Sequence, residues 1–505
     1  MKMRHKLLLL LLTAAMLLCA FGCKQAEEPD RQTTQPETTQ APKETGEFDN
    51  YPGTFKEERY SEIRDFEVAV PESDSNGYFC LSCTEDFNGS QVHDSMVRRD
   101  SMLYEKHGIS VTYNTFPAND NGVTLRQTVQ NALSSNIRTS DMIGGGLNYC
   151  ILPLNDMGFL YHINQAEYVN FDNPWWASYF IDGVAYKGNV NYAAAMALGP
   201  GFFGAPYTMI CNLYLQNQGI YLPDGTQMDI FELVETGEWT LEVFYDITRE
   251  YTLDLNHDDK IIPADDRLAY AHIRSFITAG CHYIAAGMKF SSWDEAGNIK
   301  VDLTDETVVN CVDRLQGIFD TLKDNWHDTL WDNQIQIFMN GHALFFGNSM
   351  TYIANLTQMV ADYAIIPLPK GSADQKSYYT GINTWTSAYI AIPRQVEDPE
   401  FIGHTLELLG YYAYTEVRPV LYDKIICVRL ERDLRQRDIM DTIYGSLYTD
   451  LNFIQNFAGS AGIVGNCIMD ATQSYATSIA AVATGLPMVL EKYDKDMSKA
   501  EQQNQ

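Results

Sequence analysis

The stretch ISVTYNTFPANDNGVTLRQTVQNALSSNIRTSDMIGGG, residues 109–146, decides the fold. ISVTYNTF at 109–116 is a predicted strand, and LRQTVQNALSSN at 125–136 is the predicted helix that follows it. SDMIGGG at 140–146 closes the unit as a second predicted strand. A strand, a helix and a further strand in this order are typical of a parallel sheet covered by helices.

The preceding residues extend the same alternation. GYFCLSC at 77–83 is a predicted strand, and QVHDSMVRRDSMLYEKHG at 91–108 is a predicted helix that ends at a glycine. This helix has Val92, Met96 and Leu103 on one face. The predicted fold class is therefore α/β. Ligands of such sheets bind at the carboxyl ends of the strands.

That edge of the predicted sheet carries two loops. They are Thr84 to Gly89, which follow the strand predicted at 77–83, and Gly144 to Tyr149, at the end of the strand predicted at 140–146. We expect both loops to lie at the mouth of a cleft.

The first residues form an export signal. Basic residues Lys2, Arg4 and Lys6 precede the apolar run Leu7–Leu18, so residues 1–22 are predicted to be a signal peptide that is removed. AFGC, ending at Cys23, resembles the lipobox of bacterial lipoproteins. That resemblance implies a diacylglycerol thioether, with palmitate-type acyl chains, on Cys23. The alternative is a secreted protein without lipid.

Residues 23–66 follow as a polar segment rich in Gln, Thr, Pro, Glu and Lys. Such a composition buries too little apolar surface to offset the entropy of ordering the chain. We therefore predict a flexible tether, which would hold the remaining chain near the outer face of the cytoplasmic membrane.

The charge balance excludes one class of partner. The 505 residues carry a net charge of −31 and a pI near 4.6. A phosphate backbone requires clustered Lys and Arg, so nucleic acid is not an expected partner. No later segment has 18 consecutive apolar residues.

The cysteines suggest no metal or redox site. Zinc requires four ligands at suitable spacing, and only Cys80 and Cys83 lie close together in the sequence. We interpret the cysteines after Cys23 as reduced and partly buried, with one or more disulfides as the alternative.

Most catalytic motifs are absent or out of context. GPGFFG, with Gly199, Gly201 and Gly204, has the spacing of a dinucleotide fingerprint. Pro200, the two phenylalanines after it and then Pro206 make a helix start unfavourable there, so we interpret the motif as a turn before the strand YTMICNLYL. The sequence has no GxSxG, HExxH or P-loop motif. Paired acids from distant segments could still form a glycosidase site.

One loop has the pattern of a calcium site. DLNHDDKIIPAD contains Asp254, Asn256 and Asp258 at its first, third and fifth positions. The other candidate ligands are the carbonyl of Lys260, the side chain of Asp265 at the twelfth position, and Asp266 as its substitute. Asp259 replaces the glycine usual at the sixth position. The alternative is an acidic surface turn without metal, and the expected role of bound Ca²⁺ is structural.

The ordered features resemble the extracellular solute-binding proteins of ABC importers. The resemblance is to the carbohydrate-type class that includes maltose-binding proteins, in their Gram-positive form. It covers residues 76–495. The matching segments, in order, are GISVTYN, SDMIGGGLNYCILPLNDMGFLYHI, NPWW, TMICNLYL, GEWTLEVFYDI, FMNGHALFFGNS, DYAIIPLPKG, TSAYIAIPRQVEDPE and ATQSYATSIAAVATG.

This resemblance implies a two-lobed, periplasmic-binding-protein-like fold with a ligand cleft between the lobes. The chain would cross between lobes near residues 204–212, 376–390 and 445–460. The implied domains are residues 67–205 with 385–450 as lobe 1, residues 206–384 with 451–495 as lobe 2, and residues 496–505 as a tail.

Aromatic faces for sugar rings and polar groups for hydroxyls would form the cleft. Carried over by position, the ligand-binding residues are Glu85, Asp86, Asn88, Asn148, Tyr149, Asn348, Ser349, Tyr352, Asn383, Trp385 and Tyr475. Ser349 stands where maltose-binding proteins have a stacking tryptophan, so the resemblance does not extend to maltodextrin specificity. Trp175, Trp176 and Trp239 are predicted to be packing residues, and Thr240 a helix cap.

The resemblance implies a monomeric, lipid-anchored receptor without enzymatic activity. It would capture an oligosaccharide and deliver it to ABC permease subunits. The alternatives are a surface glycan-degrading enzyme or adhesin, suggested by the calcium-type loop and the anchor, and a sensor for a membrane kinase. An enzyme of this kind that carries a dockerin module usually has two calcium-type loops. The sequence contains one, which counts against that alternative.

Overall fold

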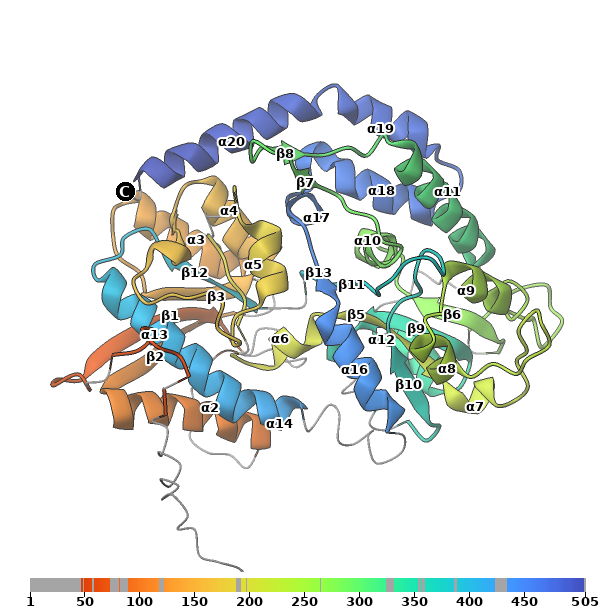
Figure 1. Cartoon of the computed structure of the whole chain (residues 1–505), viewed down its shortest axis with the longest axis horizontal. Coiled ribbons are helices and arrows are strands. Elements are labelled where there is room, and N and C mark those ends of the chain that lie inside the picture. The colour runs from red at the N-terminus through yellow and green to blue at the C-terminus, as the bar shows by residue number, and fades with distance from the viewer. Residues whose placement is uncertain are drawn as a thin grey trace, which may run out of the picture. The chain divides into compact units, whose positions relative to one another are not determined.

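Two separate sheets form the framework of the protein (Figure 1). The computed structural model describes residues 47–48, 50–56, 59–72, 81, 90–117, 122–187, 192–196, 198–263, 265–323, 331–352, 356, 359–385, 388–422 and 434–503. None of the helices in these ranges is long and apolar enough to cross a membrane. We call the regions built on the first and second sheets lobe 1 and lobe 2.

The sheet of lobe 1 has the strand order β2-β1-β3-β12-β4. Strands β1, β2 and β3 are parallel, whereas β12 runs antiparallel to both of its neighbours. The bounds are β1 Arg64–Pro71, β2 Ile109–Phe116, β3 Met142–Gly146, β4 Leu160–Tyr161 and β12 Ala388–Pro393. The predicted parallel α/β unit is thus confirmed.

Helices pack on both faces of this sheet, and its strands β3 and β12 are buried along their whole length. The helices of lobe 1 are α2 Gln91–Met102, α3 Val123–Ser134, α4 Leu152–Asp156, α5 Ser178–Val184, α13 Pro399–Tyr412 and α14 Arg418–Tyr422. Helix α2 continues as a π-helical turn over Leu103–His107 and ends at Gly108, where φ is 73°. That positive φ explains the glycine predicted to end the helix.

The sheet of lobe 2 has the order β10-β5-β9-β6. Strands β6 and β9 are parallel, and β5 runs antiparallel to both β9 and β10. The bounds are β5 Tyr207–Asn212, β6 Leu268–His272, β9 Ala343–Ser349 and β10 Tyr363–Ile366.

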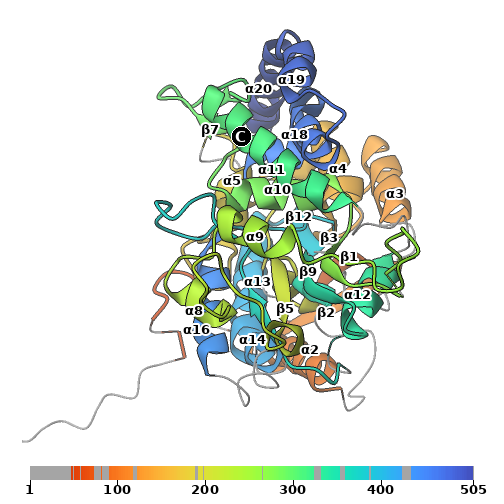
Figure 2. The same ribbon diagram turned by 90° about the vertical axis from the view of Figure 1, so that its right-hand side faces the viewer.

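Within the described residues, ten helices contribute to lobe 2 or border it. They are α7 Leu213–Gln216, α8 Ile230–Glu235, α9 Leu241–Thr248, α10 Phe276–Ala285, α11 Glu306–Thr321, α12 Trp331–Met339, α16 Arg435–Gly445, α17 Leu451–Gln455, α18 Ser460–Met469 and α19 Tyr475–Ala483. Figure 2 shows α10, α11 and α18 gathered on one side of the sheet. A hairpin of β7 Ser292–Trp293 and β8 Ile299–Lys300 follows α10.

In helix α9 of lobe 2, the local sequence determines both where the helix starts and which residues pack in the core. Thr240 accepts a hydrogen bond from the amide of Val243 and so caps the helix, as predicted. Leu241 and Phe244 enter the lobe-2 core, where Trp239 is fully buried. Trp175 and Trp176 are buried in lobe 1, so all three tryptophans are packing residues, as predicted.

The N-terminal boundary of lobe 1 differs from the prediction. The first described strand is β1, which begins at Arg64, inside the segment expected to be a tether up to residue 66. Residues before β1 also pack, because the rings of Tyr51 and Phe55 contact Trp175 at centroid distances of 4.9 and 5.8 Å. The strand predicted at 77–83 lies outside the described residues apart from Leu81.

The C-terminal region also differs. Residues 496–503, expected as a tail, belong to α20 Leu486–Gln503, whose Met497 joins the lobe-1 core. Helix α16, expected in lobe 1, contributes Ile439 and Met440 to the lobe-2 core. GPGFFG, interpreted as a turn, contains the short helix α6 Pro200–Gly204.

Candidate functional site

The chain passes between the lobes more than once. The first connection runs from Ala194, which bridges Ile390 of β12, through α6 to β5. The second runs from β11 Thr380–Gly381 to β12, and these two places agree with the predicted crossings near residues 204–212 and 376–390. β13 Leu447–Tyr448 pairs with β11, but α16 before it and α18 after it both belong to the lobe-2 core, so the chain does not change lobes at the crossing predicted near residues 445–460.

Hydrogen bonds tie these connections to one another. The amide of Asn383 donates to the carbonyl of Ala205 at 2.8 Å, and the amide of Met350 donates to that of Pro206 at 2.9 Å. The hydroxyl of Thr351 also donates to the carbonyl of Gly204, at 3.1 Å. The end of β9 and the first two connections therefore meet at one place, which we call the hinge region.

An aromatic pair lies at the hinge region. Tyr149, from the turn after β3, contacts Trp385 of the second connection, with ring centroids 4.8 Å apart and planes at 72°. Asn383 fixes this connection by accepting the amide of Trp385 at 3.1 Å. Tyr149 is 38 % exposed, so part of its ring is available to a ligand.

Polar atoms near this pair lack partners. Asn148 Oδ1 and Trp385 Nε1 are buried atoms without a hydrogen bond in the part of the chain that the structure describes. Unpaired buried polar groups are costly and few in native proteins. An acceptor and a donor left open beside an aromatic pair are suited to the hydroxyl groups of a solute.

The end of β9 carries three further predicted residues. Asn348 and Ser349 are both 2 % exposed, and Asn348 Oδ1 accepts the amide of Ser349 at 2.8 Å. Asn348 Nδ2 has no partner within the described ranges. Tyr352 belongs to the lobe-2 core. Access to these side chains would require the surrounding structure to move.

Sequence reasoning missed Thr208, which lies directly opposite Asn348 in the register of β5 and β9. Its Oγ1 is also buried and has no partner among the residues described. Residues paired across antiparallel strands point to the same face, so Thr208 and Asn348 form one polar pair. A register prediction for the two strands could have found it.

Tyr475 does not join the hinge region. It lies on α19 in the lobe-2 core, is 1 % exposed, and donates its hydroxyl to the carbonyl of Leu303 at 2.7 Å. The position of Tyr475 along the chain suggested a ligand-binding role, but its hydroxyl already has a protein partner. Glu85, Asp86 and Asn88 lie outside the described residues.

A cavity of about 390 Å³ lies between α4, α17 and α20, away from every predicted residue. A second, of about 280 Å³, opens at the start of α10, just beyond the carboxyl end of β6. Arg274, Ser275, Phe276, Asn466, Met469, Asp470 and Gln473 line it. This second cavity lies where α/β sheets commonly bind ligands, at the carboxyl end of a parallel strand.

Charged groups face each other in the second cavity. Arg274 Nη2 lies 3.9 Å from Asp470 Oδ2. Hydrogen bonds from Thr472 and Gln473 lower the pKa of Asp470 to about 2, so its carboxylate is charged at neutral pH. Sequence reasoning did not point to this cavity because it applied the strand-end rule to lobe 1 alone.

Solved structures with the same arrangement are numerous. The chain matches a cyclo/maltodextrin-binding protein complexed with maltotetraose with a TM-score of 0.53 at 11 % identity, covering 88 % of this chain and 98 % of that one. It matches the cyclic alpha-maltosyl-1,6-maltose binding protein from Arthrobacter globiformis with a TM-score of 0.53 at 10 % identity, covering 85 % and 100 %.

A third match is UgpB from Mycobacterium tuberculosis in complex with glycerophosphocholine, with a TM-score of 0.52, 12 % identity, and coverage of 86 % and 99 %. The chain has the two-lobed substrate-binding-protein fold. No family model and no curated protein matches the sequence. The substrate-binding-protein fold agrees with the resemblance drawn from the ordered segments.

The calcium-type loop lies on lobe 2 of this substrate-binding-protein fold. Asp254 Oδ1 accepts the amide of His257 at 2.7 Å, and its Oδ2 accepts that of Asp259 at 2.8 Å. Asp259, at the position usually occupied by glycine, has a φ of 62°. The backbone thus adopts the left-handed turn for which calcium loops use glycine.

Not every proposed ligand of this loop is available. Asp266 is fully buried, and both of its oxygens accept amides, from Leu255 at 2.9 Å and Ile262 at 2.6 Å. These hydrogen bonds lower the pKa of Asp266. Among the described side chains, no three or more His, Cys, Asp or Glu are grouped to hold a metal. Asn256 Oδ1 accepts the amide of Asp258 at 3.0 Å, and Asp258 Oδ1 accepts that of Lys260 at 3.0 Å, so these oxygens also take part in hydrogen bonds of the loop.

The described cysteines, Cys150, Cys211, Cys281, Cys311 and Cys467, are free thiols, and all but Cys311 are buried. Burial raises the pKa of Cys311 to about 12, so this thiol is not activated. Reduced and partly buried thiols were predicted for them. Cys80, Cys83 and Cys427 lie outside the described residues.

Proposed function

We propose that this protein is a substrate-binding protein of an ABC importer. In this proposal a monomer captures an extracellular oligosaccharide between its lobes, leaves it chemically unchanged, and delivers it to permease subunits. The observation that carries the proposal is the pair Tyr149 and Trp385, which lies at the hinge region beside the unpaired Asn148 Oδ1 and Trp385 Nε1. Aromatic faces with a few polar groups are the usual surroundings of a bound sugar.

The solved relatives support the class of solute. Two of those compared bind malto-oligosaccharides, linear or cyclic, according to their descriptions, and one binds glycerophosphocholine. At identities of 10 to 12 % these relatives establish the fold, whereas the solute class remains our proposal. We favour an oligosaccharide because an open aromatic face lies at the hinge region.

We propose further that Cys23 carries a lipid and that residues 24–50 tether the binding unit to the outer face of the cytoplasmic membrane. The lipobox-like AFGC and the polar composition support this part. A Cys23→Ser variant is expected to move from the membrane fraction to the medium. If the variant stays in the membrane fraction, the lipid is not the anchor.

We also propose a structural Ca²⁺ in the loop 254–265. Its ligands would be Asp254, Asn256, Asp258, the carbonyl of Lys260, and Asp265. The left-handed φ of Asp259 supports this, and Oδ2 of Asp254, which accepts the amide of Asp259, has a second lone pair that could face the metal. Bound Ca²⁺ would supply positive charge that draws the loop oxygens together.

The solute-binding proposal is tested with the mature chain, made without residues 1–22 and with Cys23→Ser. The probes are maltotetraose, cyclic maltosyl-maltose and glycerophosphocholine. Binding raises the unfolding temperature because a ligand of the native state adds RT ln(1 + [L]/Kd) to stability. Chromatography of each probe afterwards should show it intact. Shortened glycan would instead indicate the alternative, a glycan-degrading enzyme.

Measurements of solute uptake distinguish an importer component from a sensor that signals to a membrane kinase. Cells that lack this protein should lose uptake of the bound solute if it serves an importer. Unchanged uptake, with a lost transcriptional response to the solute, would favour the sensor.

A further inference from the structure

Arg99, on α2 of lobe 1, is a buried arginine whose guanidinium donates hydrogen bonds to several of the described residues. Nε donates to Asp100 Oδ1 at 2.7 Å, and Nη1 donates to the carbonyl of Leu198 at 2.8 Å. Nη2 donates to Tyr113 Oη at 2.6 Å and, more weakly, to the carbonyl of Leu81 at 3.5 Å. The side chain is 1 % exposed.

Asp100 and Tyr113 hold the guanidinium in place. Tyr113, on β2, donates its hydroxyl to Asp100 Oδ2 at 2.7 Å, so the two residues and Arg99 form a closed set of hydrogen bonds. A buried charge of this kind is rarely the most stabilising choice, because desolvation offsets most of the attraction. The planar arrangement of its donors does give Arg a fixed geometry that Lys lacks.

Of these two carbonyls, that of Leu198 belongs to the first connection, whereas Leu81 packs on β3. Leu198 lies two residues before α6 in the first connection, where the carbonyls of Gly204 and Ala205 accept hydrogen bonds from Thr351 and Asn383. Leu81 lies over β3, because a Cβ on Gly144 would come within 2.6 Å of Leu81 Cδ1. The turn with Asn148 and Tyr149 follows that strand.

We propose that Arg99 is a positioning residue of the solute site. It fixes the lobe-1 end of the first connection against the sheet, so that bending between the lobes is confined to the residues beyond Leu198. The expected effect of Arg99 on solute affinity rests on the proposed solute-binding function. Its expected effect on the rigidity of the first connection does not.

Hydrogen exchange on the mature chain tests the structural part. Arg99→Lys keeps the charge beside Asp100, but a single ammonium cannot reach both carbonyls. We expect amide exchange in residues 198–206 and at Asn383 to become at least about tenfold faster, with β1, β2 and β3 unchanged. Arg138→Lys is the matched control, because Arg138 also joins two acceptors in lobe 1, Glu67 and Asp141.

Unchanged exchange at residues 198–206 would overturn the proposal, and so would faster exchange spread evenly over lobe 1. If Arg99→Lys does not fold, Tyr113→Phe serves instead, since it removes one partner of the guanidinium and leaves Leu198. It should speed exchange in the same segment by about threefold. No change there, or an even change over the lobe, would again overturn the proposal.

Affinity is the second readout. For any probe that the wild type binds, Arg99→Lys should raise Kd about tenfold while Arg138→Lys leaves it unchanged. Equal Kd values for all three proteins would overturn the positioning role. If the wild type binds none of the probes, the proposed function fails, and the exchange experiment alone decides the role of Arg99.

Discussion

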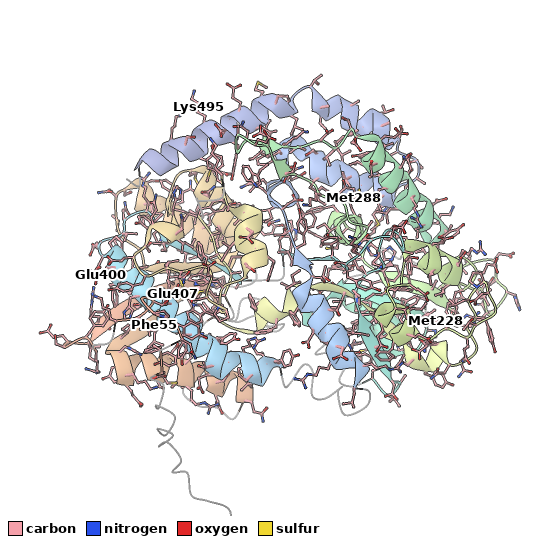
Figure 3. The ribbon with its side chains drawn as sticks, viewed as in Figure 1. Phe55, Met228, Met288, Glu400, Glu407 and Lys495 are labelled. Atoms are coloured by element: carbon pink, nitrogen blue, oxygen red, sulfur yellow. The ribbon has the colours of Figure 1, made fainter. Side chains whose placement is uncertain are left out.

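Trp175 donates a hydrogen bond from Nε1 to Glu407 Oε2 at 2.8 Å. Trp176 donates to the other oxygen at 2.8 Å, and Asn170 and Asn173 supply two further donors. Burial raises the pKa of Glu407 to about 7, and the donated hydrogen bonds oppose that rise. One carboxyl on α13 thus fixes the NPWW segment, and Figure 3 shows Glu407 inside lobe 1 near Phe55.

Replacing this carboxyl should destabilise the protein. Glu407→Gln leaves one acceptor oxygen and turns an amide toward donors, so we expect a loss of about 2–4 kcal/mol in the free energy of unfolding. Denaturant unfolding measures it. Glu400→Gln on the same helix is the control, because its ion pair with Lys56 is partly exposed and should contribute less than about 1 kcal/mol. Equal losses would contradict this role for Glu407.

Buried histidines should make stability depend on pH. Burial lowers the pKa of His162, His282 and His404 to about 4, and that of His272 to about 3. An unfolded chain titrates near 6.5, so between about pH 4 and 6.5 it binds more protons than the native state. The free energy of unfolding should therefore rise with pH across this window.

Each such histidine contributes a slope of up to about 1.4 kcal/mol per pH unit. Denaturant unfolding of wild type and His282→Gln across the window measures the contribution of that residue. The variant should show a shallower slope, although it will also be less stable because its buried hydrogen bond to the Thr278 carbonyl changes. Parallel slopes would show that His282 is protonated alike in both states.

The aromatic pair should determine affinity for a sugar. Tyr149→Ala removes an exposed ring face, and we expect Kd for the bound glycan to rise about tenfold. Trp385→Phe keeps a ring and removes the unpaired Nε1, so its effect should be smaller, about three- to tenfold. Calorimetry measures both. Tyr214→Ala, which removes a 61 % exposed tyrosine on α7, should leave Kd unchanged.

Calcium should stabilise the wild type and not a loop variant. Ca²⁺ at a hundred times its Kd adds about 2.7 kcal/mol, and EDTA should remove this gain. Asp258→Asn removes one ligand charge without affecting the buried Asp266. Calorimetric unfolding with Ca²⁺, Mg²⁺ and EDTA provides the comparison. If Ca²⁺ and Mg²⁺ have equal effects on wild type and variant, the loop is an acidic turn without a specific metal.

The sequence was most informative where local patterns and burial agree. The predicted strand at 109–116 has the bounds of β2, and the predicted helix at 91–108 covers α2 and its π-helical end, because both have local signals. β1 was missed because its first residues, RDFE, resemble the polar segment before them. Helix α20 had a signal that was overlooked, since Leu486, Leu490, Tyr493 and Met497 recur at helical spacing.

The candidate site was harder to predict because distant segments form it. Tyr149 and Trp385 are 236 positions apart, and only the order of segments suggested that they meet. Thr208 was missed because its pairing with Asn348 depends on strand register. Tyr475 was assigned by position along the chain, whereas packing of α19 places it in the lobe-2 core.

The central claim is that two lobes close over a solute that they leave unchanged. Small-angle scattering of the mature chain, with and without a saturating glycan that raises its unfolding temperature, tests this most directly. We expect a smaller radius of gyration with the glycan, and we expect to recover the glycan intact afterwards. A radius of gyration that stays the same for every solute, or recovery of a cleaved glycan, would contradict it.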